Sequence, residues 1–202
     1  MTEETHPVRQ PDPELDLVLD ARSMRALAHP VRIRILGLLR ADGPQTSTTL
    51  AKTLGLNSGA TSYHLRQLAE QGLIQEATDL GSGRERWWRT PSRQTFLNRT
   101  LLKGEDDTEA AMAYMRAAGL FYGEHLMRAI EHAAVRQDEW RRVTSFSDFL
   151  FLLTHDEASR LVDELHAVLD RYRPLHRQST EPTPTGARVF EIQLHAYPRE
   201  TD

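Results

Sequence analysis

Cysteine is absent from the 202 residues, and only two lysines accompany 23 arginines. A chain without thiols forms neither disulfides nor thiolate metal sites, which fits a reducing cytoplasm. Long hydrophobic runs are also missing. The longest spans six residues, 110–115, whereas a membrane-spanning helix needs roughly 20. The first 14 residues are acidic and polar, unlike a signal peptide. These absences predict a cytoplasmic protein without a membrane segment.

The net charge of −4 argues against a nucleic-acid binder. This value, however, averages over segments of opposite charge. Residues 20–91 carry a net charge of +4, while residues 1–19 and residues 92–202 each carry −4. A basic module between acidic flanks is compatible with a local phosphate-binding surface. The preference for arginine over lysine runs through acidic segments as well, so it carries no functional weight.

The first half of the chain reads as a series of short helices. Residues 1–14 contain three prolines and predict a mobile tail. Apolar spacing predicts helices over residues 15–28 and 30–41, separated at His29 and Pro30. Ser47 or Thr48 is expected to cap a third helix that stops at Gly55.

A fourth helix and a hairpin complete this region. Asn57 is a good N-cap for a helix over residues 58–71. Two strand-like segments follow, residues 73–78 and 84–90, with two glycines in the short link between them. Three or four short helices followed by a hairpin is the order of a winged helix-turn-helix, predicted here as a domain over residues 15–92.

Three segments also resemble one family, the ArsR-type winged-helix transcriptional regulators. They are ALAHPVRIRILGLL, TLAKTLGLNSGATSYHLRQLAEQGLI and GRERWWR, within residues 20–90. The most specific parts are Ala-His-Pro-x-Arg-x-x-Ile-Leu, Ser-x-His-Leu-x-x-Leu and Gly-Leu-Ile. The metal-sensing branch of this family carries a cysteine motif in the third helix, where this chain reads STTLAKTL. Thiol-based metal sensing is therefore excluded.

The resemblance implies that residues 58–71 are the recognition helix in the major groove. Its outward face bears Arg66 and Gln67, which suit guanine and adenine edges respectively. His64 flanks the inward stripe and suits either a half-buried structural role or a phosphate contact. Tyr63 either stacks on a sugar or closes the edge of the domain. The expected DNA contacts from the third and fourth helices are Ser47, Thr48, Lys52, Ser58, Gly59, Ser62, Tyr63, His64, Arg66 and Gln67.

The predicted wing spans residues 79–89 and is expected to lie on the DNA backbone or in the minor groove. Its basic side chains are Arg84, Arg86 and Arg89. Trp87 and Trp88 are expected to pack the hairpin onto the helices rather than to touch DNA. An ordinary polar surface is the alternative interpretation of both the wing and the recognition helix.

A long helix is predicted from residue 104 to about residue 136. Its apolar stripe repeats every 3.5 residues, as in helices that pack against another helix. A two-fold dimer would reach two half-sites on DNA, so this helix, with the one near residues 15–27, is assigned to dimerisation. An intramolecular bundle is the alternative. The stripe consists of Met112, Met115, Gly119, Tyr122, Leu126 and Ala129.

The acidic and histidine pairs on this helix, Glu124 with His125 and Glu131 with His132, do not match a zinc spacing. They are interpreted as solvated or salt-bridged. No metal, cofactor or catalytic residue is predicted, because the chain has no Gly-rich phosphate loop and no nucleophile–base constellation. The chain is therefore not expected to be an enzyme.

The last third predicts a strand over residues 145–154, a helix over 156–172 that Thr154 caps, and a strand over 188–198. This strand–helix–strand unit either stiffens the dimer or lines a pocket for a small-molecule effector. The pocket would use Phe149, Phe151, Tyr172 or Phe190. Residues 93–202 are thus assigned to dimerisation and effector binding.

These predictions combine into one fold class and one leading function. The fold is mainly α with small β, containing an N-terminal winged helix-turn-helix, a long dimerisation helix and a C-terminal strand–helix–strand unit. The function is a cytoplasmic, homodimeric, sequence-specific DNA-binding transcriptional regulator, more a repressor than an activator. The alternative is a winged-helix protein-interaction module that does not bind DNA.

Overall fold

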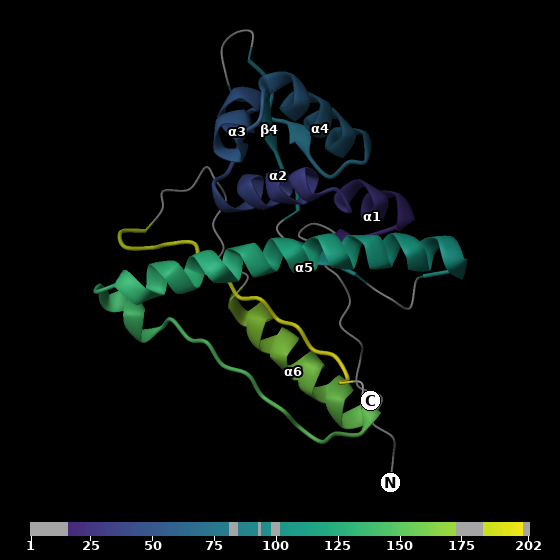
Figure 1. Cartoon of the computed structure of the whole chain (residues 1–202), viewed down its shortest axis with the longest axis vertical. Coiled ribbons are helices and arrows are strands. Elements are labelled where there is room, and N and C mark those ends of the chain that lie inside the picture. The colour runs from purple at the N-terminus through teal and green to yellow at the C-terminus, as the bar shows by residue number, and fades with distance from the viewer. Residues whose placement is uncertain (1–15, 81–84, 93, 98–101, 173–183, 200–202) are drawn as a thin grey trace. The chain divides into compact units, whose positions relative to one another are not determined.

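The structure, a computed structural model, describes residues 16–80, 85–92, 94–97, 102–172 and 184–199. The expected tail, residues 1–14, lies outside this range. The described residues fall into two compact units, residues 16–135 and residues 136–199. The first unit contains the predicted helix-turn-helix and the long helix (Figure 1).

The helix-turn-helix forms as the spacing predicts. Two antiparallel pairings join its three short strands in the order β2-β4-β3, so the hairpin packs beside the helices as a wing. The elements are α2 (Pro30–Ala41), β2 (Gln45–Thr46), α3 (Ser47–Leu54), α4 (Ser58–Glu70), β3 (Gln75–Glu76) and β4 (Trp87–Arg89).

Local signals explain where these helices begin and end. Pro30 occupies the first turn of α2, and the Asn57 side chain accepts the Ala60 N–H at 2.8 Å as the N-cap of α4. Gly55 ends α3 with a φ of 67°, a left-handed conformation that glycine adopts without strain. The prediction for the start of α3 was wrong by one residue, because Thr46 is the N-cap and accepts the Thr49 N–H at 3.2 Å.

The predicted first helix was wrong over residues 16–20. Residues Asp16–Val18 form strand β1, which pairs in parallel with β5 (Gln94–Phe96), and α1 covers only Ala21–Leu27. Asp20 accepts the Ser23 N–H at 2.8 Å, and the Asp20 N–H bonds the Ser23 hydroxyl. This reciprocal cap fixes the helix start, while β1 depends on a strand 78 residues away. Local periodicity carries no information on such a pairing.

The long helix α5 (Gly104–Val135) packs against both α1 and α2. In Figure 1 it runs beneath α1 and α2, on the side opposite to α3 and α4. Its inward residues join one hydrophobic core with the helix-turn-helix. Among the core side chains, fully buried ones are Met24, Leu27, Ile35, Leu36, Leu50, Leu65, Leu68, Leu73 and Ile74.

The second unit contains a short 3₁₀ helix (Glu139–Arg142) and α6 (His155–Tyr172). Thr154 and Glu157 cap α6 reciprocally: Glu157 accepts the Thr154 N–H at 2.8 Å and donates its own N–H to the Thr154 hydroxyl at 3.3 Å. The expected helix is therefore present.

The strands expected on either side of α6 are absent from the described structure. Residues 145–154 and 188–198 form no strand in the described structure. Alternation of apolar residues assigns side chains to faces, but a strand exists only where a neighbouring strand accepts its hydrogen bonds. No such neighbour lies within the described part of one chain.

The coarse fold class is confirmed: the chain is mainly helical with small sheets, and the helix-turn-helix carries a wing. No helix within the described residues is both long and apolar enough to cross a membrane.

Candidate nucleic-acid interface

Helix α4 separates sharply into a buried and an exposed face. Thr61, Leu65 and Leu68 are fully buried, and the Thr61 hydroxyl donates to the Asn57 carbonyl at 3.0 Å. The opposite face presents Ser58, Gly59, Tyr63 and Arg66 to solvent, with Ser62, His64 and Gln67 half-buried. Because the inner face anchors the helix in the core, the outer face is held rigidly and is open to a ligand.

Two cations on this side make no contact within the described structure. The side chains of Arg66 on α4 and Lys52 on α3 are exposed and form no hydrogen bond or ion pair with described residues. Their charges are therefore available to phosphates or base edges. Thr48 is also exposed and Ser47 half-buried.

Gln67 is different from these. Its amide nitrogen donates to the Glu70 carboxylate at 2.8 Å, one turn further along α4. A contact with adenine would require this bond to open, so Gln67 is a weaker candidate for base recognition than Arg66.

His64 lies against a second histidine. Its ring centroid is 4.6 Å from that of His29, the N-cap of α2, and 5.5 Å from that of Tyr63. Burial, together with the neighbouring Arg32 charge, lowers the pKa of both imidazoles. His64 Nδ1 and Arg32 Nε are buried without a hydrogen-bond partner. The fold therefore favours the neutral form of both imidazoles where α2 meets α4.

The wing holds its described arginines in ion pairs. Arg89 contacts the Asp79 carboxylate at 2.9 Å, and Arg86 lies 4.0 Å from Glu76. Arg86 is exposed, so its pair is weak and open to competition by phosphate. Trp88 is buried and Trp87 half-buried, which agrees with packing of the hairpin onto the helices. Arg84 lies outside the described residues.

Helix α5 buries one face inside its own unit and leaves a second face open. Ala110, Ala111, Tyr114, Ala117 and Ala118 are buried. The predicted dimer stripe is more accessible: Met112 and Leu126 are 42 % and 43 % exposed, Gly119 and Ala129 are exposed, and Met115 and Tyr122 are half-buried. Met112 and Leu126 thus face outward, whereas Met115 and Tyr122 pack against the core of their own unit.

The helix near residues 15–27 was expected to share in dimerisation. Instead, Met24 and Leu27 of α1 are fully buried within the unit, which leaves these side chains no surface to offer a partner.

The first acidic and histidine pair of α5, Glu124 and His125, makes contacts inside the unit, whereas Glu131 and His132 are exposed. Glu124 forms an ion pair with Arg34 of α2 at 3.4 Å, and the His125 ring lies 4.2 Å from that of Phe121. Among the described residues, no group of three or more His, Asp and Glu side chains is arranged to hold a metal.

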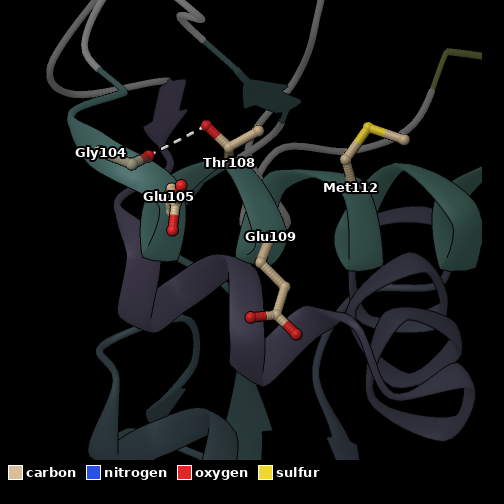
Figure 2. Close-up of a pocket in the computed structure, with 5 residues that line it drawn as sticks. All are labelled: Gly104, Glu105, Thr108, Glu109 and Met112. Carbon is tan, nitrogen blue, oxygen red and sulfur yellow. Dashed lines mark hydrogen bonds between the residues drawn. The ribbon is translucent and has the colours of Figure 1, made fainter.

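A shallow cavity of about 460 Å³ opens at the start of α5. Figure 2 shows its lining residues on successive turns, with the Thr108 hydroxyl donating to the Gly104 carbonyl at 3.0 Å. Glu105 and Glu109 make this surface acidic, so it repels a polyanion. None of the aromatic residues expected to line an effector pocket contributes to it.

Two basic residues escaped the sequence-based prediction. Arg32 joins the histidine pair, and Arg40 is half-buried where α2 meets Ser92 and Thr95. Arg40 donates to the Ser92 carbonyl at 3.2 Å, to the Ser92 hydroxyl at 3.1 Å and to the Thr95 hydroxyl at 3.0 Å. No local pattern marks an arginine as half-buried, because its partners lie more than 50 residues away.

One comparison with known proteins falls on the same region. Residues 27–76 match a family model described as a helix-turn-helix domain. The chain is 34 % identical over 59 residues to the HTH-type transcriptional regulator YgaV of Escherichia coli, covering 29 % of this chain and 60 % of that one. It is 43 % identical over 54 residues to the HTH-type transcriptional regulator NmtR of Mycobacterium tuberculosis, covering 27 % of this chain and 44 % of that one.

The chain thus spans about half the length of these curated relatives. Both relatives are named as transcriptional regulators and not as enzymes, in agreement with the prediction. A solved MarR family regulator, NMB1585 from Neisseria meningitidis, aligns at 16 % identity with a TM-score of 0.32, over 72 % of this chain and 76 % of that one. ZitR from Lactococcus lactis aligns at 18 % identity with a TM-score of 0.31, over 72 % and 84 %.

Proposed function

We propose that this chain is a sequence-specific DNA-binding transcriptional regulator of the ArsR type that acts as a homodimer. The observation that carries the proposal is the division of α4: Thr61, Leu65 and Leu68 anchor it while Arg66 and the first-turn residues stay open. The match of residues 27–76 to a helix-turn-helix domain supports it.

In this proposal α4 enters the major groove. Ser58 and Gly59 at its N-terminus approach the base edges, and Arg66 binds guanine O6 and N7 with two parallel hydrogen bonds. Lys52, Thr48 and Ser47 of α3 bind phosphates and fix the register. The wing, with Arg84, Arg86 and Arg89, lies along the backbone or the minor groove.

Two copies of the chain pair through α5. The open stripe containing Met112, Gly119 and Leu126 packs against the same stripe of the partner. A two-fold dimer presents two recognition helices to half-sites about one helical turn apart. The dimer represses by occupying promoter DNA in the cytoplasm, and a small molecule or protein signal shifts it to a geometry that no longer fits.

The experiment that tests the proposal is to sequence the genomic DNA that the purified protein retains, at two salt concentrations. We expect a recurrent two-fold symmetric site whose affinity falls steeply as salt rises, because bound phosphates release counterions. Retention of random DNA, or of none, contradicts the proposal. The second of these results is the one that a protein-interaction module would give.

A further inference from the structure

The described part of the second unit shows no buried core. None of the described residues between 136 and 199 is buried. Its large apolar side chains are instead exposed, including Phe149, Leu150, Phe151, Leu152, Val168, Tyr172, Val189, Phe190 and Ile192. A domain is stable when its helices and strands bury one apolar face against another. The described residues of one chain do not provide that second layer.

The extended segment before α6 needs a partner most clearly. Residues 148–153 make no backbone hydrogen bond with any described residue. Phe149 and Phe151 lie on one side, with ring centroids 6.2 Å apart, so Leu150 and Leu152 lie on the other. A segment that is apolar on both faces is typical of a strand in the middle of a sheet.

Helix α6 shows the same incompleteness. Leu165, Val168 and Tyr172 follow one another at three- and four-residue spacing and all are exposed. The segment over residues 189–196 alternates apolar and polar side chains, as a strand covered on one face does. An extended segment without a paired neighbour is not stable on its own.

We propose that this unit is completed by the same unit of a second copy. Residues 148–153 of the two chains pair as antiparallel strands across a two-fold axis, residues 189–196 flank them, and the two α6 helices cover the sheet with their apolar stripes. The partner is a second copy because the segment with unmet hydrogen bonds is apolar on both faces, so its best-matched neighbour is an identical segment.

The exposed area is consistent with such an assembly. A large apolar side chain contributes on the order of 150 Å², so this unit exposes on the order of 1,000 Å² of apolar surface in one chain. That is more than the largest patch on a typical monomer, roughly 300–600 Å². Two copies together would bury on the order of 2,000 Å², the range of stable dimers.

This interface does not depend on DNA binding, and it uses other residues than the stripe on α5. Its failure is therefore distinguishable from failure of the proposed function. A full-length chain with Leu126→Asp disrupts only the α5 stripe, and one with Leu152→Asp disrupts only the second unit.

The test compares Leu152→Asp with Ser159→Asp, which places the same charge at an exposed polar position of α6. Sedimentation over a range of concentrations measures the dimer dissociation constant of each full-length protein. We expect Leu152→Asp to raise this constant about tenfold or more, because it places a charge in an apolar segment that the partner covers. Ser159→Asp should leave it unchanged. Equal constants for wild type and Leu152→Asp overturn the proposal.

The absence of cysteine gives a second, geometric test. Single cysteines at positions 150, 151 and 152 are introduced in turn, and the full-length proteins are oxidised. Antiparallel pairing brings at least one of these positions within disulfide distance of its copy, so a covalent dimer should form there and not with Ser159→Cys. If none of the three positions gives a covalent dimer, the proposal is overturned. It is also overturned if hydrogen exchange shows that the amides of residues 148–153 are equally protected in dilute monomer, because the segment then pairs elsewhere.

Discussion

Gly37 of α2 lies directly beneath the ring of Phe121 of α5, and a Cβ at position 37 would meet Phe121 Cζ at 2.7 Å. Glycine is therefore the residue that lets the helix-turn-helix and the long helix pack closely. Gly37→Ala adds helix propensity but forces the ring to move. We expect a net loss of about 1–2 kcal/mol in the free energy of unfolding, measured by urea denaturation.

A double-mutant cycle isolates the cause of that loss. In a Phe121→Leu background the ring is gone, so adding Gly37→Ala should no longer destabilise the protein and should stabilise it slightly through helix propensity. The same loss in both backgrounds would show that the glycine serves some other purpose than this contact.

Arg66 and Lys52 should affect DNA binding in different ways. Arg66→Ala is expected to cost about 1–3 kcal/mol at one base position and to relax sequence preference there. Lys52→Ala is expected to weaken binding to all sequences alike and to reduce the salt slope by about one. Fluorescence anisotropy on matched and mismatched sites measures both. Arg116→Ala, an exposed arginine of α5, is the control. Identical behaviour of all three variants would contradict the assignment of α4.

The His29–His64 pair should make stability depend on pH. Burial and the Arg32 charge lower the pKa of both imidazoles in the folded state. The unfolded chain, with a pKa of about 6.5, therefore binds more protons below that pH, and stability falls as the pH drops from about 7 toward 5. Urea unfolding at several pH values measures this loss.

His64→Gln removes one member of the pair and should flatten the dependence of stability on pH. His132→Gln, an exposed histidine of α5, should leave the dependence as in wild type. The two pH values to compare are about 5.5 and about 7.5, which bracket the ordinary histidine pKa of about 6.5. If the wild-type protein is equally stable at both, the fold does not favour the neutral form of the pair.

Substitution of Arg40 is expected to reduce the stability of the fold, although arginine is usually a surface residue. Burial lowers its pKa to about 10, so it remains charged near neutral pH and keeps three hydrogen bonds to Ser92 and Thr95. Arg40→Met leaves these acceptors unsatisfied. We expect a loss of about 2–3 kcal/mol in the free energy of unfolding.

Two further variants identify the origin of that loss. Arg40→Lys keeps the charge but not the planar fork, so an intermediate loss is expected. Arg116→Met, in an exposed position, should change stability by less than about 0.5 kcal/mol. If Arg40→Met leaves the free energy of unfolding unchanged, the half-buried guanidinium contributes no net stability.

The parts of the fold set by neighbouring residues were predictable. Local signals include the caps at Asn57 and Gly55, the proline at the start of α2 and the pairing of Thr154 with Glu157. The helices that they delimit begin and end within a residue or two of the predicted positions. The division of α4 into an inner and an outer face follows from helical spacing alone.

The parts of the fold that depend on distant residues could not be predicted from the sequence. Strand β1 was mistaken for helix because its partner is β5, and Arg40 was not recognised because its acceptors lie on another segment. The strands around α6 were predicted from alternation, but alternation does not supply a neighbour. Within the site, residue type suggested a base contact for Gln67, whereas its bond to Glu70 is visible only in three dimensions.

The parallel pairing of β1 with β5 also has a consequence for synthesis on the ribosome. Asp16–Val18 leave the exit tunnel first among the paired strands, yet Gln94–Phe96 emerge only after all four short helices and the wing have been made. At about 5–20 residues per second this interval lasts several seconds, far longer than a helix takes to form. The opening strand of the nascent chain therefore waits unpaired until the remainder of the winged helix has been translated.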